Sequence, residues 1–232
     1  AGIAIGTVAL PELSKKIKIG NWDDAHKIQN RSLELCLLLS VPACYGLIIA
    51  SKEITSALFG YGSFFEKDVI LTATALKYFG YGVPAFALIK VLSNFFFARD
   101  NTRTPFYISC FSVFLNILIS LIYFKKIGFL IIPIATSIAT WSAVLIYLIL
   151  LIKSKYFYIK HQFFINTVKI LASSLIMSLG LYYLLNFFED KLIYSSYYKS
   201  IYLIMIISLV TSVYLLIVRL LGVFKIKNFK TD

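Results

Sequence analysis

Residue types that bind metals or carry out catalysis are scarce in this sequence. Two histidines and three cysteines occur among 232 residues, and no CxxC pair or other metal-ligand spacing joins them. Cys36, Cys44 and Cys110 lie in apolar stretches, so we expect unpaired packing residues. His26 and His161 lie in polar connections without clustered carboxylates. The sequence therefore predicts no metal, no cofactor and no enzymatic activity.

Charge is scarce as well, and this limits the class of protein. Charged residues make up 15% of the chain, against 59% hydrophobic and 16% aromatic residues, and the mean hydropathy is +0.83. Such a chain is too apolar for a water-soluble domain of this length. The 5 prolines and 11 glycines are dispersed, and no repeat or low-complexity block occurs. A polytopic membrane protein is the remaining class.

Several apolar stretches are long enough to cross a membrane, which takes about 20 residues of helix for a ~30 Å hydrocarbon core. The stretches that qualify are 32–50, 69–98, 105–124, 128–152, 163–188 and 201–224. Residues 1–13 are apolar without a basic leader or cleavage site, so we expect the end of a truncated span and not a signal peptide. The predicted fold class is all-α, a transmembrane bundle of about six full spans plus the truncated one.

A polar segment ahead of the first full span predicts the start of a helix. Asn21 and Trp22 are followed by Asp23 and Asp24. This order supplies a capping side chain and carboxylates in the first turn.

Basic residues are unevenly distributed between alternate connections, which predicts the orientation. One side holds Lys15, Lys16, Lys18, Lys27, Arg31, Arg99, Arg103, Lys153, Lys155, Lys160, Lys169, Arg219, Lys225, Lys227 and Lys230. The other side holds Lys52, Lys67, Lys125, Lys126, Lys191 and Lys199. By the positive-inside rule the first side is predicted to be cytoplasmic, and both ends of the chain lie on that side. The net charge of +12 then reflects topology, and a nucleic-acid partner is not expected.

The second span is unusual because it carries Lys77, Lys90 and a helix-breaking sequence. Pro84 cannot donate to the carbonyl of Gly80, and Gly82 removes side-chain packing, so we expect a kink or local unwinding. An intramembrane ammonium group costs about 2.5 to 3.5 kcal/mol, so it should face a polar interior unless it snorkels to the interface.

Polar residues in the third span share one helix face. Ser112, Asn116 and Ser120 are spaced four apart, which favours hydrogen bonds to a neighbouring helix. No intramembrane carboxylate follows Glu34, so a carboxylate-based proton or sodium site is not predicted. A charged ligand of the interior would be an anion.

Several segments together resemble the MurJ (MviN) family of lipid II flippases. They are GIAIGTVALPELS at Gly2 to Ser14, NRSLEL at Asn30 to Leu35, GVPAF at Gly82 to Phe86 and FFARDNTRTP at Phe96 to Pro105. The last is the most specific because a long run matches in order. The resemblance is sharp up to Pro105 and weakens along the rest of the chain.

This resemblance implies a two-lobed transporter of the multidrug/oligosaccharidyl-lipid/polysaccharide exporter superfamily in the bacterial cytoplasmic membrane. Its substrate would be lipid II, the undecaprenyl-diphosphate-linked precursor of cell-wall peptidoglycan. Residues 1–153 would belong to the second lobe, and residues 154–232 to two additional C-terminal helices with a cytoplasmic tail. The first lobe would be a partner outside this chain. The arginines that line the family's cavity would lie in that lobe and in the part of the family's eighth helix that precedes Gly2.

The resemblance also implies candidate site residues. Lys90 and Asn116 would lie in the substrate cavity. The cytoplasmic loop, as a gate or as a structural turn, would comprise Arg99, Asp100, Thr102, Arg103 and Pro105.

Two alternative functions remain at this point. One is another polysaccharide-lipid exporter of the same superfamily, and the other is a non-transporting, half-length membrane partner. A reading frame just upstream that encodes a first lobe would favour the flippase.

Overall fold

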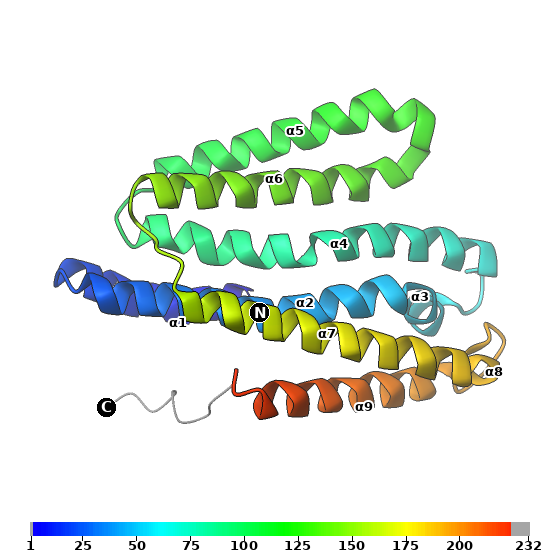
Figure 1. Cartoon of the computed structure of the whole chain (residues 1–232). Coiled ribbons are helices and arrows are strands. Elements are labelled where there is room, and N and C mark those ends of the chain that lie inside the picture. The colour runs from blue at the N-terminus through cyan, green and yellow to red at the C-terminus, as the bar shows by residue number, and fades with distance from the viewer. Residues whose placement is uncertain (1, 224–232) are drawn as a thin grey trace. The chain divides into compact units, whose positions relative to one another are not determined.

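The computed structural model describes residues 2–223, and every regular element in this range is helical (Figure 1). The elements are α1 (Gly2–Lys18), α2 (Trp22–Ile49), α3 (Ser51–Phe59), α4 (Glu66–Phe97), α5 (Arg103–Ile127), η1 (Gly128–Leu130), α6 (Ile131–Lys153), α7 (His161–Phe187), α8 (Glu189–Leu192) and α9 (Lys199–Leu220). The predicted all-α class is confirmed.

The helices form two compact units. Unit 1 contains the described residues of 1–40 and 78–164, and unit 2 those of 41–77 and 165–232. Helices α2, α4 and α7 each contribute to both units, because the boundaries fall inside them. The predicted division at residue 153 concerns the lobes of the family, and it stays a prediction.

Five apolar segments within residues 2–223 are long and apolar enough to cross a membrane. One of them, Arg103–Lys153, has 51 residues and contains both α5 and α6. These two helices fold back on each other in Figure 1, and the chain reverses after Gly128, whose φ of 70° favours glycine. The chain is a multi-pass membrane protein, and a count of six spans stays a prediction.

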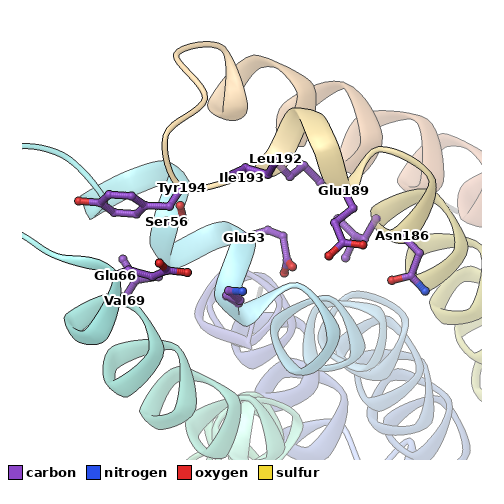
Figure 2. Close-up of a pocket in the computed structure, with 11 residues that line it drawn as sticks. Glu53, Ser56, Glu66, Val69, Asn186, Glu189, Leu192, Ile193 and Tyr194 are labelled. Atoms are coloured by element: carbon purple, nitrogen blue, oxygen red, sulfur yellow. The ribbon is translucent and has the colours of Figure 1, made fainter.

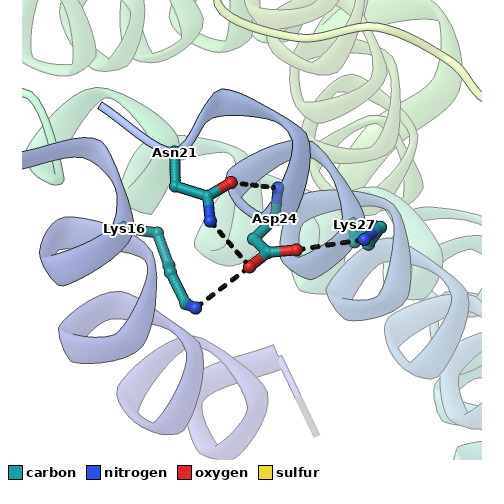
Figure 3. A network of polar contacts seen from close by, with 4 residues as sticks. All are labelled: Lys16, Asn21, Asp24 and Lys27. Carbon is teal, nitrogen blue, oxygen red and sulfur yellow. Dashed lines mark hydrogen bonds and ion pairs between the residues drawn. The ribbon is translucent and has the colours of Figure 1, made fainter. Parts of the chain in front are cut away.

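The predicted helix start at Asn21 is confirmed, since α2 begins at Trp22. The Asn21 side chain accepts a hydrogen bond from the Asp24 backbone at 3.1 Å. The Asp24 carboxylate pairs with Lys16 of α1 and Lys27 of α2, each at 3.0 Å (Figure 3). The capping motif thus also ties the end of α1 to the start of α2.

Helix α4 stays α-helical through Pro84, so it is not unwound there. Two carbonyl groups before the proline accept hydrogen bonds from α6. Ser137 Oγ donates to the Tyr78 carbonyl at 2.8 Å, and Trp141 Nε1 donates to the Tyr81 carbonyl at 2.9 Å. A Cβ at Gly82 would lie 2.9 Å from Ser137 Oγ, so this glycine permits the close approach. A bend at Gly80, Gly82 and Pro84 stays a prediction.

Unit 2 contains a buried lysine with an unusual set of partners. Lys199, at the start of α9, is 2% exposed. Its Nζ donates to the carbonyls of Gly60 at 2.7 Å and Tyr194 at 2.8 Å. It also lies 4.3 Å from the ring centroid of Tyr61 and 4.7 Å from that of Tyr194. The ammonium group therefore links the loop after α3 to the loop before α9, through hydrogen bonds to backbone carbonyls and cation–π contacts with tyrosine rings.

Candidate substrate cavity

A cavity of about 620 Å³ opens in unit 1 between α1, α4, α5 and α6. Its polar lining residues are Thr7, Lys90, Ser93, Asn94, Thr102 and Ser109. Apolar side chains from the same helices, among them Phe97 and Phe106, complete the wall. A cavity of mixed lining suits a ligand with both a polar and an apolar part.

Lys90 brings the positive charge into this cavity. It projects from α4, its side chain is exposed, and no carboxylate belongs to the lining. Among the residues that the structure describes, no ion pair or hydrogen bond engages its ammonium group. Lys77, the other intramembrane lysine, does not line the cavity. Lys90 therefore lines a cavity, and its place in a substrate cavity stays a prediction.

Two glycines of α1 shape one wall of the cavity. A Cβ at Gly2 would lie 2.7 Å from the carbonyl oxygen of Ala87 in α4. A Cβ at Gly6 would clash with the side-chain amide of Asn94. Gly2 and Gly6 are four residues apart, which is the small-xxx-small spacing that lets membrane helices approach closely. Gly2 and Gly6 were not predicted as cavity residues, although their four-residue spacing is a signal visible in the sequence.

Arg99 holds the loop between α4 and α5 against the segment after α6. Its guanidinium donates to the Phe95 carbonyl at 2.6 Å and the Tyr156 carbonyl at 2.8 Å, and lies 4.5 Å from the Tyr156 ring centroid. Burial lowers the pKa of Arg99 because it disfavours the charged form. The two carbonyls and the ring offset that cost. Arg99 does not line the cavity, and these contacts support a structural role.

The other loop residues divide into two groups. Thr102 and Pro105 line the cavity, whereas Asp100 and Arg103 do not. Asp100 lies in the left-handed turn after α4, with φ of 56°. Arg103 is the exposed first residue of α5. A gating role for any of these loop residues stays a prediction.

Asn116 is engaged between α5 and α6 and does not line this cavity. Its amide donates to Thr136 Oγ1 of α6 at 2.8 Å. Ser112 on the same face donates to the Ala139 carbonyl at 3.2 Å. The predicted hydrogen bonding between helices is confirmed, and substrate contact by Asn116 stays a prediction.

Comparison with known proteins places this arrangement in a family. The family model "Lipid II flippase MurJ" matches residues 1–218. A probable lipid II flippase MurJ of Rickettsia prowazekii (strain Madrid E) is 39% identical over 140 residues, which cover 60% of this chain and 28% of the relative. One from Buchnera aphidicola subsp. Baizongia pistaciae (strain Bp) is 28% identical over 99% of this chain and 45% of the relative.

A solved structure supports the same assignment. The lipid II flippase MurJ in an inward closed conformation matches with a TM-score of 0.75 and 29% identity, over 93% of this chain and 42% of that chain. The chain thus spans less than half the length of each of these relatives. With a family model matching nearly its whole length, the chain belongs to the MurJ family of lipid II flippases.

Proposed function

We propose that this chain is the part of a lipid II flippase that carries the second lobe and the C-terminal helices. The observation that carries the proposal is the cavity of unit 1, which has Lys90 in its wall and no carboxylate. A diphosphate headgroup needs such a cationic, water-accessible surface inside the membrane. The proposed mechanism is alternating access, in which two lobes expose the headgroup first to the cytoplasm and then to the outer face.

The proposal extends to the partner and the location. A first lobe would supply the remaining cationic groups, with residues 1–153 on the facing lobe and residues 154–232 outside it. The membrane would be the bacterial cytoplasmic membrane, and the flippase would serve peptidoglycan synthesis.

Growth of a strain depleted of its own flippase tests the function. A chimaera that joins the first lobe of a related MurJ to this chain is expected to restore colony formation. A chimaera that reaches the membrane at a normal level but neither restores growth nor moves lipid II would contradict the proposal.

Lys90→Ala in that chimaera is expected to reduce lipid II translocation by about tenfold, since one charge-assisted contact to the diphosphate is lost. Lys77→Ala is the matched control, because Lys77 lies on the same helix but does not line the cavity. Translocation is measured as the fraction of lipid II that is accessible at the outer face of the membrane. It is normalised to the amount of the chimaera in the membrane. Wild-type translocation by the Lys90 variant would identify a snorkelling or packing residue.

Orientation is tested by cysteine labelling in intact cells, with Cys36, Cys44 and Cys110 replaced by alanine. A cysteine at Ser195, on the predicted outer side, is expected to react with an impermeant reagent. A cysteine at Ser154, on the predicted cytoplasmic side, is expected to react only after permeabilisation. The reverse pattern would refute the topology. The C-terminus at Asp232, also predicted to be cytoplasmic, lies outside the described residues.

A further inference from the structure

Unit 2 contains a second cavity, which the proposed transport function does not use. It has a volume of about 270 Å³ and is lined by residues of α3, α4, α7 and α8 and of the loop before α9. Glu53, Glu66 and Glu189 contribute carboxylates, and Lys52 contributes the ammonium group in the lining. When all four are ionised, the pocket carries a net charge of −2.

The carboxylates reach the pocket from separate helices, as Figure 2 shows. Glu53 of α3 and Glu189 of α8 point toward one another, and Glu66 approaches from the start of α4. The amide of Asn186 in α7 lines the same space. The fold therefore assembles oxygen donors from four elements around one small volume.

Two buried oxygen atoms in this lining lack a partner. Glu53 Oε2 and Ser56 Oγ are shielded from solvent, and no described residue hydrogen-bonds to either. Ser56 is 4% exposed and lines the pocket together with Glu53. Buried polar atoms in native proteins are nearly always satisfied, so orphaned oxygens beside a cavity indicate an occupant that interacts with oxygen.

The electrostatics indicate that the occupant is positive. Burial raises the pKa of the Glu53 carboxyl and is the largest effect; a hydrogen bond from the Glu53 backbone and the charge of Lys52 lower this pKa, and the charge of Glu189 raises it. The ionised form of Glu53 is thus destabilised in the empty pocket. A cation between Glu53 and Glu189 would relieve both the burial cost and the repulsion.

Pocket size distinguishes a bare ion from a hydrated one. Among residues 2–223, no three His, Cys, Asp or Glu side chains are arranged to hold a metal ion directly. The volume equals that of about nine water molecules at ~30 Å³ each, so an ion with its inner waters fits. Mg²⁺ keeps several waters and often binds through one or two carboxylates.

We propose that this pocket, formed by Glu53, Ser56, Glu66, Asn186 and Glu189, binds one hydrated divalent cation, Mg²⁺ or Ca²⁺. The charge of the ion matches the net charge of the lining. By joining α3 and α4 to α7 and α8, the ion would stabilise this end of unit 2. The site is independent of lipid II.

Ion binding to the intact, purified protein that contains this chain tests the site. Equilibrium dialysis over a range of free Mg²⁺ or Ca²⁺ up to millimolar is expected to show one saturable divalent site per wild-type chain, and weaker binding at that site in Glu53→Gln. Loss of one ligand charge should weaken the site at least about tenfold. Ser56→Ala removes a neutral ligand and should weaken it about fivefold.

Asp190→Asn is the matched control, because Asp190 adjoins Glu189 in α8 but does not line the pocket. It is expected to bind as the wild type does. If Glu53→Gln does not elute as a monodisperse protein, Glu189→Gln replaces it, since Glu189 is exposed. Equal retention by the wild type and the pocket variants would overturn the proposal. Tight binding of spermidine that divalent ions do not displace would overturn it as well, in favour of an organic amine.

Discussion

Expressed by itself, this 232-residue chain is expected to leave a flippase-depleted strain unable to form colonies. A flippase must shield a polar path from lipid and open it to each side of the membrane in turn, which requires two lobes. The chain covers 42% of the solved MurJ that it matches, and under the proposed function it supplies one of the two lobes.

The charge of the cavity leads to the same expectation. Lys90 is the cation in the described lining, whereas a diphosphate carries about two negative charges. Removing such an anion from water costs several kcal/mol, which one ammonium group does not offset. Under the proposed function, a first lobe would have to supply further cations for binding as well as for closure.

Co-expression with a MurJ first lobe is the control for this prediction, and it is expected to restore colonies. Membrane levels of the chain are measured in both strains, so that a missing product is not mistaken for an inactive one. Colonies from the chain alone would contradict the two-lobe argument and favour a homodimeric transporter.

Lys199→Met is expected to destabilise the protein by about 3 kcal/mol. Methionine fills a similar space but leaves the carbonyls of Gly60 and Tyr194 without their donor, and hydrogen bonds to charged groups contribute about 1.5 to 3 kcal/mol each. The ring contacts with Tyr61 and Tyr194 are also lost. Thermal unfolding of the purified protein in detergent is the measurement.

Lys191→Met is the matched control, since Lys191 is an exposed lysine in the same region of unit 2. It is expected to unfold at the wild-type temperature. Lys199→Arg keeps the charge and should recover part of the stability. Equal unfolding temperatures for Lys199→Met and Lys191→Met would show that the buried ammonium does not stabilise the fold.

The sequence by itself determined the class of this protein and several local features. Long apolar runs have one stable form in a membrane, the helix, because it satisfies its own backbone hydrogen bonds. The start of α2 was also predictable, since Asn21 caps the Asp24 backbone three residues away. These features depend on neighbours in sequence, so composition and spacing are sufficient to find them.

Only the tertiary structure decided which polar groups meet. Lys90 and Lys77 are alike in sequence as intramembrane lysines, but Lys90 lines the cavity because α1, α5 and α6 surround its part of α4. The sequence placed Lys199 in a connection between two spans, and the structure buries it against Gly60, which lies 139 residues earlier. The packing of distant helices determines the surroundings of each charge, and hydropathy carries no information about that packing.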